Sequence, residues 1–182
     1  MPSPAANAAP APVIWFIGQP NAGKTTTAQA LAQRLAARGV GLEILDGNEL
    51  RQRLSPELGF TFADRRIQVR RVAHLARLLS DHGIWCLVAV IAPYQALRDQ
   101  AREILGSRMV EVHLRCALDI LAARDHKGLY ARALKGEIAN FTGVSDPFEE
   151  PAAPDLAFDS GRTPVEPMVD QIMAWLAERG RL

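Results

Sequence analysis

Residues 18–25 read Gly-Gln-Pro-Asn-Ala-Gly-Lys-Thr and fit the pattern G-x-x-x-x-G-K-[ST], which is typical of a phosphate-binding loop (P-loop). Gly18 and Gly23 allow backbone N–H groups to turn inward around phosphate oxygens. Lys24 supplies a positive charge for the β- and γ-phosphates, and the Thr25 hydroxyl can ligate Mg²⁺. The motif predicts a nucleoside-triphosphate site formed by Gly18, Gln19, Pro20, Asn21, Ala22, Gly23, Lys24, Thr25 and Thr26.

The segments on either side of this motif fit its expected context. Residues 13–17 (Val-Ile-Trp-Phe-Ile) form a short apolar run that suits a buried parallel strand. Residues 25–38 carry apolar side chains at the spacing of one helix face, and Gly39 follows as a C-terminal cap. The alternative interpretation of residues 18–25 is a glycine-containing turn with an ordinary surface lysine. Such a turn would not need a strand before it and a helix after it, so the order of strand, loop and helix favours the P-loop.

The rest of the chain continues the alternation of strand and helix. We expect further strands at 40–45, 84–91, 109–114 and 156–158, and helices at 48–54, 63–82, 94–105, 118–123 and 165–179. The run 84–91 carries no charge and is predicted to be the central strand. Residues 124–154 are rich in Gly, Pro and charged residues, which is typical of a structureless functional loop or lid. The pattern predicts an α/β fold of the P-loop NTPase type, a doubly wound parallel sheet flanked by helices, with a lid segment.

Length and composition indicate one soluble domain. The 182 residues are 48% hydrophobic and 23% charged, and the net charge of +1 does not favour nucleic acid or an anionic membrane as a partner. No apolar stretch reaches the roughly 18 residues that span a bilayer. Cys86 and Cys116 match no metal-binding spacing and are expected to be reduced core thiols of a cytoplasmic protein. Residues 1–12 are expected to form a flexible tail.

Several stretches beyond the P-loop form a recognisable set: Leu45-Asp-Gly47, Leu58-Gly-Phe60, Asp64-Arg65 with Arg70-Arg71, Pro93-Tyr94, Arg124-Asp125, Lys127-Gly-Leu-Tyr130, Gly136-Glu-Ile138 and Asn140-Phe-Thr-Gly143. Together with the P-loop they resemble the adenylylsulfate kinase family, whose members phosphorylate the 3′-hydroxyl of adenosine 5′-phosphosulfate with Mg-ATP in sulfate assimilation. The resemblance implies a kinase domain over 13–182, ATP and Mg²⁺ as cofactors with Thr25 at the metal, a nucleotide substrate, and a cytoplasmic homodimer.

The resemblance also assigns roles to individual residues. Lys24, Asp46 and Lys127 are implied to be catalytic. Arg51 and Arg65 would bind the phosphosulfate, for which guanidinium groups are suited. The implied substrate-binding set is Asp46, Asn48, Arg51, Phe60, Arg65, Gln68, Ile91, Ala92, Lys127 and Phe141.

Some of these residues have simpler interpretations when each is taken alone. Phe60 and Phe141 are implied to sandwich the substrate base, but Phe60 taken alone could be a core aromatic, which is more often true of an isolated Phe. Arg65 belongs to an arginine-rich run, and such runs are usually solvated helix faces. The joint match along the chain favours the functional interpretation of both Phe60 and Arg65.

The chain departs from the family pattern mainly around the acceptor. The family has Asp-Gly-Asp-Asn where this chain has Asp46-Gly-Asn-Glu49, and Asn48 cannot take up a proton at neutral pH. Gln68 stands where the family has Asn, and Ala92-Pro-Tyr-Gln95 replaces Ser-Pro-Tyr-Arg. Residues 19–21 (Gln-Pro-Asn) replace the usual Leu-Ser-Gly of the P-loop.

Two alternatives follow from these departures. The protein could phosphorylate another anionic nucleotide or small metabolite, for example in a capsule or natural-product pathway. It could also be a nucleotide-binding partner subunit without catalysis, although the intact Gly23-Lys-Thr25 argues against this. A free-standing GTPase is disfavoured because the chain lacks an Asn-Lys-x-Asp motif.

Overall fold

A computed structural model describes residues 10–182 of the chain. Its core is a five-stranded, entirely parallel sheet with the order β2-β3-β1-β4-β5. The strands are β1 (Val13–Ile17), β2 (Leu42–Asp46), β3 (Trp85–Ala89), β4 (Met109–Arg115) and β5 (Leu156–Asp159). The predicted fold is therefore confirmed.

The central strand is β1, so the prediction that residues 84–91 are central was wrong. Ile14 of β1 pairs with Leu87 of β3 on one side and with Val110 of β4 on the other. Both β1 and β3 are buried along their whole length, because each has strands on both sides and helices on both faces. Their apolar sequences indicate burial equally well, and burial alone does not give the order of strands.

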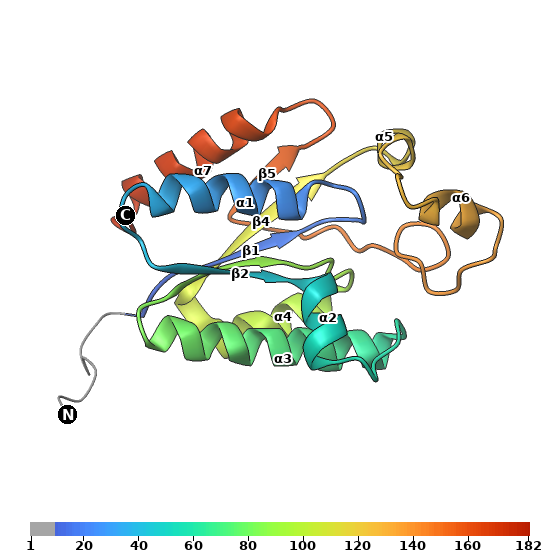
Figure 1. Cartoon of the computed structure of the whole chain (residues 1–182), viewed down its shortest axis with the longest axis horizontal. Coiled ribbons are helices and arrows are strands. Elements are labelled where there is room, and N and C mark those ends of the chain that lie inside the picture. Colours follow the sequence, from blue (N-terminus) through green and yellow to red (C-terminus); the bar gives the residue numbers. More distant parts are fainter. Residues whose placement is uncertain (1–9) are drawn as a thin grey trace.

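Helices cover the two faces of the sheet (Figure 1). One face carries α1 (Lys24–Ala36) and α7 (Val165–Glu178), and the other carries α3 (Phe62–Asp81) and α4 (Gln95–Leu105). Alternate residues of β1 serve the two layers: Ile14 and Phe16 pack in the first core, while Trp15 packs in the second. The short α2 (Gly47–Leu54) directly follows β2, and a 3₁₀ turn, Gly106–Arg108, precedes β4.

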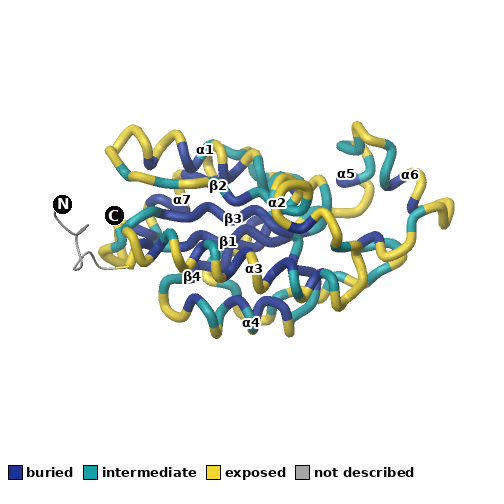
Figure 2. Tube along the Cα trace, turned by 60° about the horizontal axis from the view of Figure 1, so that its bottom comes forward, coloured by how far each residue is buried: buried dark blue, intermediate teal, exposed yellow. Residues whose placement is uncertain are grey.

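The lid segment (residues 124–154) is not structureless as predicted. It contains α6 (Leu129–Leu134), which together with α5 (Leu118–Ala123) lies at the end of the molecule, apart from the helical layers (Figure 2). Tyr130 and Ala133 of α6 are buried, and the Asp125 carboxylate accepts a hydrogen bond from the Tyr130 N–H at 2.6 Å. These contacts stabilise a helix that the Gly- and charge-rich composition obscures.

Residues 1–9 of the expected tail lie outside the described residues, and the expectation is wrong for Ala11. Ala11 is buried, and its N–H donates to the Ser80 carbonyl at 3.0 Å. Cys86 is a buried free thiol as expected, and burial raises its pKa to about 12. Cys116 is also a free thiol, and it is half-buried and packs against the core.

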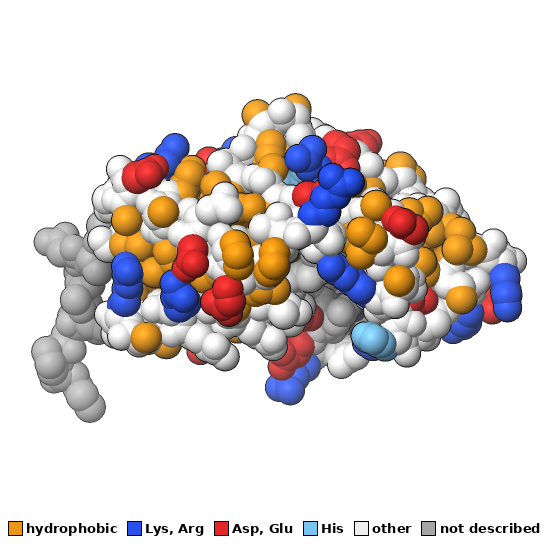
Figure 3. Space-filling model, turned by 90° about the horizontal axis from the view of Figure 1, so that it is seen from above, with side chains coloured by type: hydrophobic (Ala, Val, Ile, Leu, Met, Phe, Trp, Pro, Cys, Tyr) orange, Lys and Arg blue, Asp and Glu red, His pale blue; other side chains and the backbone are white. Residues whose placement is uncertain are grey.

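The surface shows no strong segregation of charge on the face that carries α1 and α7. Basic and acidic side chains lie interspersed there, with hydrophobic side chains in small groups between them (Figure 3). Within residues 10–182, no helix is both long and apolar enough to span a bilayer.

Candidate active site

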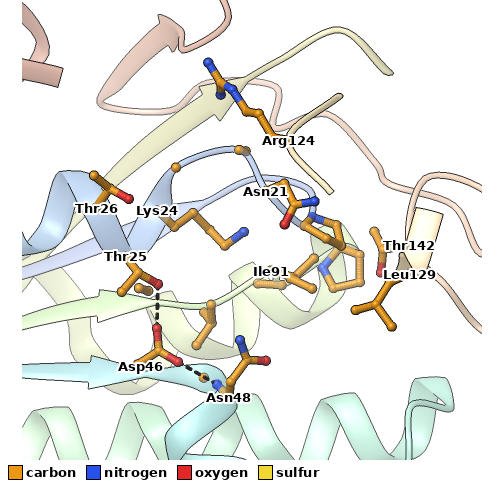
Figure 4. A pocket seen from close by; sticks show the side chains of 18 of the residues that line it. Asn21, Lys24, Thr25, Thr26, Asp46, Asn48, Ile91, Arg124, Leu129 and Thr142 are labelled. Carbon is orange, nitrogen blue, oxygen red and sulfur yellow. Dashed lines mark hydrogen bonds between the residues drawn. The ribbon is translucent and has the colours of Figure 1, made fainter. Parts of the chain in front are cut away.

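A cavity of about 740 Å³ lies at the carboxyl ends of the strands, where ligands bind in open α/β sheets. Its wall comes from the P-loop, the ends of β2 and β3, the start of α3, the lid segment and the start of α7. Figure 4 shows Lys24, Thr25 and Asp46 on one side of this cavity and the lid residues Leu129 and Thr142 on the other.

The P-loop has the backbone geometry that the motif predicts. Gly18 has φ +150°, and a Cβ at this position would lie 2.5 Å from the Leu114 carbonyl oxygen, so only glycine fits. The Lys24 ammonium donates to the carbonyls of Gly18 at 2.8 Å and Gln19 at 2.7 Å. Burial lowers the pKa of Lys24 to about 7, although nearby Asp46 opposes the shift. An incoming phosphate would supply a negative counter-charge, which favours the protonated form of Lys24.

Thr25 and Asp46 meet at the floor of the cavity. The Thr25 hydroxyl donates to Oδ2 of Asp46 at 2.6 Å (Figure 4). Oδ1 of Asp46 caps α2 by accepting the N–H of Asn48 at 2.8 Å and that of Glu49 at 3.3 Å. The cap orients the carboxylate, so that its second oxygen faces the P-loop.

This pair of oxygen donors fits Mg²⁺. Across residues 10–182, no group of three His, Cys, Asp or Glu residues could hold a metal on its own. Mg²⁺ is commonly bound by one or two protein oxygens with water and substrate phosphates completing the octahedron, and Thr25 with Asp46 supplies that number.

The cavity wall near the start of α3 contains an exposed aromatic ring. Phe60 is 52% exposed, which argues against a core role, and the Arg51 guanidinium lies 4.7 Å from its ring centroid. Ile91 and Ala92 line the cavity after β3, and Ala92 has the unusual φ of +42° for a residue with a side chain.

Arg65 is distinct from the other arginines of its run. It is 6% exposed, whereas those at 66, 70, 71 and 77 are exposed, so a solvated helix face is the wrong description for Arg65 alone. Its Nε donates to the Phe60 carbonyl at 2.9 Å, and its Nη2 donates to the Asn140 carbonyl at 2.7 Å. Arg65 therefore joins α3 to the lid segment.

Phe141 and Gln68 are buried at the cavity wall. The Phe141 ring packs edge-on against Tyr130 with centroids 4.9 Å apart. Oε1 of Gln68 is buried and finds no hydrogen-bond partner within residues 10–182. A ligand donor could satisfy it, since buried polar atoms are rarely left without a partner.

The family model that describes "Adenylylsulphate kinase" matches residues 10–159. The chain belongs to this family. It is 48% identical to "Adenylyl-sulfate kinase" of Paraburkholderia xenovorans, and the match covers 97% of this chain and 98% of that protein.

Solved structures of family members have the same architecture. A Mycobacterium tuberculosis APS kinase in complex with AMPPNP and APS matches with a TM-score of 0.89 and 34% identity, covering 93% of this chain and 99% of that one. A hexameric APS kinase from Thiobacillus denitrificans matches with a TM-score of 0.70 and 30% identity, covering 96% of this chain and 30% of that one.

The structure places nearly all the residues expected of an adenylylsulphate kinase around one cavity. Lys24, Asp46 and Lys127 line it, as do all the other predicted substrate-binding residues and positions 20–26 of the P-loop. The predicted residues outside its wall are Gly18, which packs against β4, and Gln19, which packs against Gly143 of the lid segment. Gln95 also lies outside the wall and bonds to Arg98 and Asp99.

Sequence reasoning missed several residues of the wall. They are Arg124, His126, Leu129, Thr142, Ser160, Thr163, Pro164, Val165 and Met168, among others. Arg124 and Thr142 lie within stretches that resemble the family, so the resemblance could have indicated them. The residues from 160 onward belong to no motif, and only the fold brings the start of α7 beside the P-loop.

Proposed function

We propose that this protein transfers the γ-phosphoryl group of Mg-ATP to the 3′-hydroxyl of adenosine 5′-phosphosulfate, giving 3′-phosphoadenosine 5′-phosphosulfate and ADP. One observation carries the proposal: in a chain of this family, the P-loop and the Phe60–Arg65–Phe141 wall face a single cavity. The M. tuberculosis relative was solved with both AMPPNP and APS. A common cavity can bring two nucleotides into contact, which phosphoryl transfer requires.

The donor half would act mainly through charge and position. The 3′-oxygen would form a bond to the γ-phosphorus while the bond from that phosphorus to the β–γ bridging oxygen breaks, and the hydroxyl proton would pass to the Asp46 carboxylate or to water. Lys24 and the P-loop amides would stabilise the transferring group. Thr25 and Asp46 would hold Mg²⁺, which neutralises phosphate charge, and Asp46 would orient the acceptor hydroxyl or a metal-bound water. Lys127 reaches the cavity from the lid segment and would add positive charge near the phosphates.

The acceptor half would hold the second nucleotide by stacking and ion pairing. Phe60 and Phe141 would contact the two faces of the base, while Arg51 and Arg65 would pair with the phosphosulfate. The remaining wall residues Asn48, Gln68, Ile91 and Ala92 would complete the pocket. Closure of residues 124–141 over both nucleotides would exclude water from the reaction.

The first test is an ADP-release assay with Mg-ATP and adenosine 5′-phosphosulfate, with adenosine 5′-monophosphate and a cytidine diphosphate derivative as parallel acceptors. We expect saturation by the phosphosulfate at low concentration and no turnover with the other two. Mass spectrometry of the product should show one added phosphoryl group. ATP binding without phosphosulfate-dependent turnover would contradict the proposal.

The departures at Asn48, Gln68 and Ala92 all lie in the cavity wall, so the assay also tests the alternatives. Turnover with a different anionic nucleotide would identify a relative with another acceptor. ATP binding without turnover on any acceptor would identify a non-catalytic partner subunit. Turnover of the phosphosulfate would show that Asn48 is compatible with catalysis.

The homodimer and the cytoplasmic location implied by the family resemblance remain part of the proposal. The relative from T. denitrificans is described as hexameric, so assembly differs from what we propose in at least one homologue. Light scattering of the purified protein at several concentrations would distinguish a monomer, a dimer and a larger oligomer.

A further inference from the structure

The Asp146 carboxylate joins three segments that surround the acceptor half of the cavity, although Asp146 itself does not line the cavity. Its Oδ1 accepts the Tyr94 hydroxyl at 2.6 Å, and its Oδ2 lies 3.6 Å from Nε of Arg65. The Asp146 side chain is 12% exposed. Tyr94 follows β3, Arg65 belongs to α3, and Asp146 belongs to the lid segment, so one carboxylate connects all three.

Asp146 also closes the turn that presents Phe141. The Asp146 N–H donates to the Phe141 carbonyl at 3.1 Å, and the Asp146 carbonyl accepts the Gly143 N–H at 2.7 Å. An isolated β-bridge pairs Thr142 with Asp146. The residue that bonds to Tyr94 and faces Arg65 therefore also belongs to the hydrogen-bonded turn that carries Phe141.

Arg65 extends this connection to both aromatic residues. Its guanidinium bonds to the carbonyl of Phe60 and to that of Asn140, the residue before Phe141. A shift of Arg65 would therefore move the backbone at Phe60 and beside Phe141 relative to each other. The contact energy of a stacked base is sensitive to such shifts, because a gap of about 0.5–1 Å forfeits a quarter to a half of the attraction.

We propose that Asp146 and Tyr94 are positioning residues that set the spacing between Phe60 and Phe141, and thereby the affinity for the planar base of the acceptor nucleotide. This inference rests on the proposed function, because it assigns the acceptor to the slot between these rings. Burial and the neighbouring Asp146 raise the pKa of Tyr94 to about 12, so its hydroxyl remains a donor across the range of ordinary assays.

The test compares Tyr94→Phe, Asp146→Asn and Asp146→Ala with the wild type. Tyr94→Phe removes one hydroxyl and leaves the Asp146–Arg65 pair intact. It therefore tests the effect of the Tyr94–Asp146 hydrogen bond without changing any charge. Asp146→Asn keeps an acceptor for Tyr94 and should partly rescue the effect of Asp146→Ala. Glu137→Gln is the matched control, because Glu137 is a half-exposed carboxylate of the same lid segment whose side chain, within residues 10–182, pairs only with Arg132.

We expect Tyr94→Phe and Asp146→Ala to raise the KM for adenosine 5′-phosphosulfate roughly tenfold, in line with loss of a hydrogen bond to a charged group. The KM for ATP should change little in both variants. The melting temperature should change little in Tyr94→Phe but should fall in Asp146→Ala, because the buried Arg65 guanidinium loses its counter-ion. The double variant should be no worse than Asp146→Ala alone, since both changes break one network. An unchanged acceptor KM, or an equal rise for both substrates, would overturn the inference.

Hydrogen exchange of the substrate-free protein provides a readout that does not depend on the acceptor. The amides of residues 141–146 should exchange faster in Tyr94→Phe and Asp146→Ala than in the wild type or Glu137→Gln. A wild type that fails to turn over the phosphosulfate would contradict the proposed function. Unchanged exchange in both variants would overturn the positioning role, whatever the acceptor is.

Discussion

The Thr25 hydroxyl donates to Oδ2 of Asp46 at 2.6 Å, which joins the first turn of α1 to the end of β2. The two residues belong to motifs that are separate in the sequence, and the parallel sheet brings their strand ends to one edge. The other oxygen of Asp46 caps α2, so its carboxylate has a fixed orientation toward the P-loop. This geometry supports the role proposed for Asp46 at the metal or at the acceptor hydroxyl.

Asp46→Asn should therefore lower kcat by about 10²–10⁴-fold, the usual range for loss of a group that acts on a proton in the transition state. Asparagine caps a helix as well as aspartate, so α2 should remain folded. ATP affinity, measured by calorimetry, should change little, because Lys24 and the P-loop amides are unchanged and the asparagine side-chain oxygen can still accept the Thr25 hydroxyl or face the metal. Glu49→Gln, which alters an exposed carboxylate beside the site, is the control. Unchanged turnover in Asp46→Asn would remove Asp46 from the mechanism.

ATP binding should take up a proton at Lys24. Burial lowers the pKa of the free lysine to about 7, and bound phosphate should raise it again. Above pH 7, Lys24 of the ATP-free protein is mostly neutral and must take up a proton to pair with phosphate. The apparent affinity for ATP should therefore fall as pH rises, by up to about tenfold per pH unit. Below pH 7 this dependence should disappear.

Calorimetry at pH 8 in two buffers of different ionisation enthalpy measures this uptake directly. We expect close to one proton for the wild type and a clearly smaller value for Lys24→Arg, because a guanidinium stays charged. An equal uptake in both proteins would show that the proton goes to another group.

Phe60→Ala should raise the acceptor KM roughly tenfold, since stacking contributes about 1–3 kcal/mol per base. Stability should change little, because the ring is 52% exposed and already contacts solvent. Leu78→Ala is a matched control: Leu78 is 57% exposed on the same helix that follows Phe60, and it lies outside the cavity wall. Equal acceptor KM values for Phe60→Ala and Leu78→Ala would show that the ring does not contact the base.

Gly143→Ala should destabilise the contact between the P-loop and the lid segment. Gly143 has φ +87°, and an added Cβ would overlap Oε1 of Gln19. We expect a lower melting temperature and weaker ATP binding, with a cost of about 1–3 kcal/mol from backbone strain alone. Adding Gln19→Ala should relieve the overlap but not the strain, so it should restore only part of the stability. A Gly143→Ala protein as stable as the wild type would contradict this packing.

Much of the site follows from local sequence. The P-loop is recognisable because its glycines, lysine and threonine each have a local reason to be there. The strands and helices are recognisable from apolar runs and helical spacing. The predicted ends of most elements differ by one or two residues from those in the structure, as at α1 and β3. Asp46 could also be predicted, because a carboxylate after a parallel strand lies at the ligand edge of the sheet.

Other features depended on contacts between distant segments. The order of the strands cannot be read from apolar runs, because β1 and β3 are equally buried. The burial of Arg65 among exposed arginines depends on carbonyls of Phe60 and Asn140 that converge only in the folded chain. The helix α6 depends on the burial of Tyr130. The Tyr130 hydroxyl donates at 2.9 Å to the carbonyl of Pro20, which belongs to the P-loop.

The sequence by itself determined the fold class, the phosphate-binding loop and the family, because these depend on short-range patterns of residue type and spacing. The tertiary structure decided which side chains face one cavity and which act behind it. Asp146 shows the difference: nothing in its neighbourhood along the chain distinguishes it from other acidic residues of the lid segment. Its position between Tyr94 and Arg65 arises from packing across the sheet edge, because a network of buried polar groups can form only where segments meet away from water.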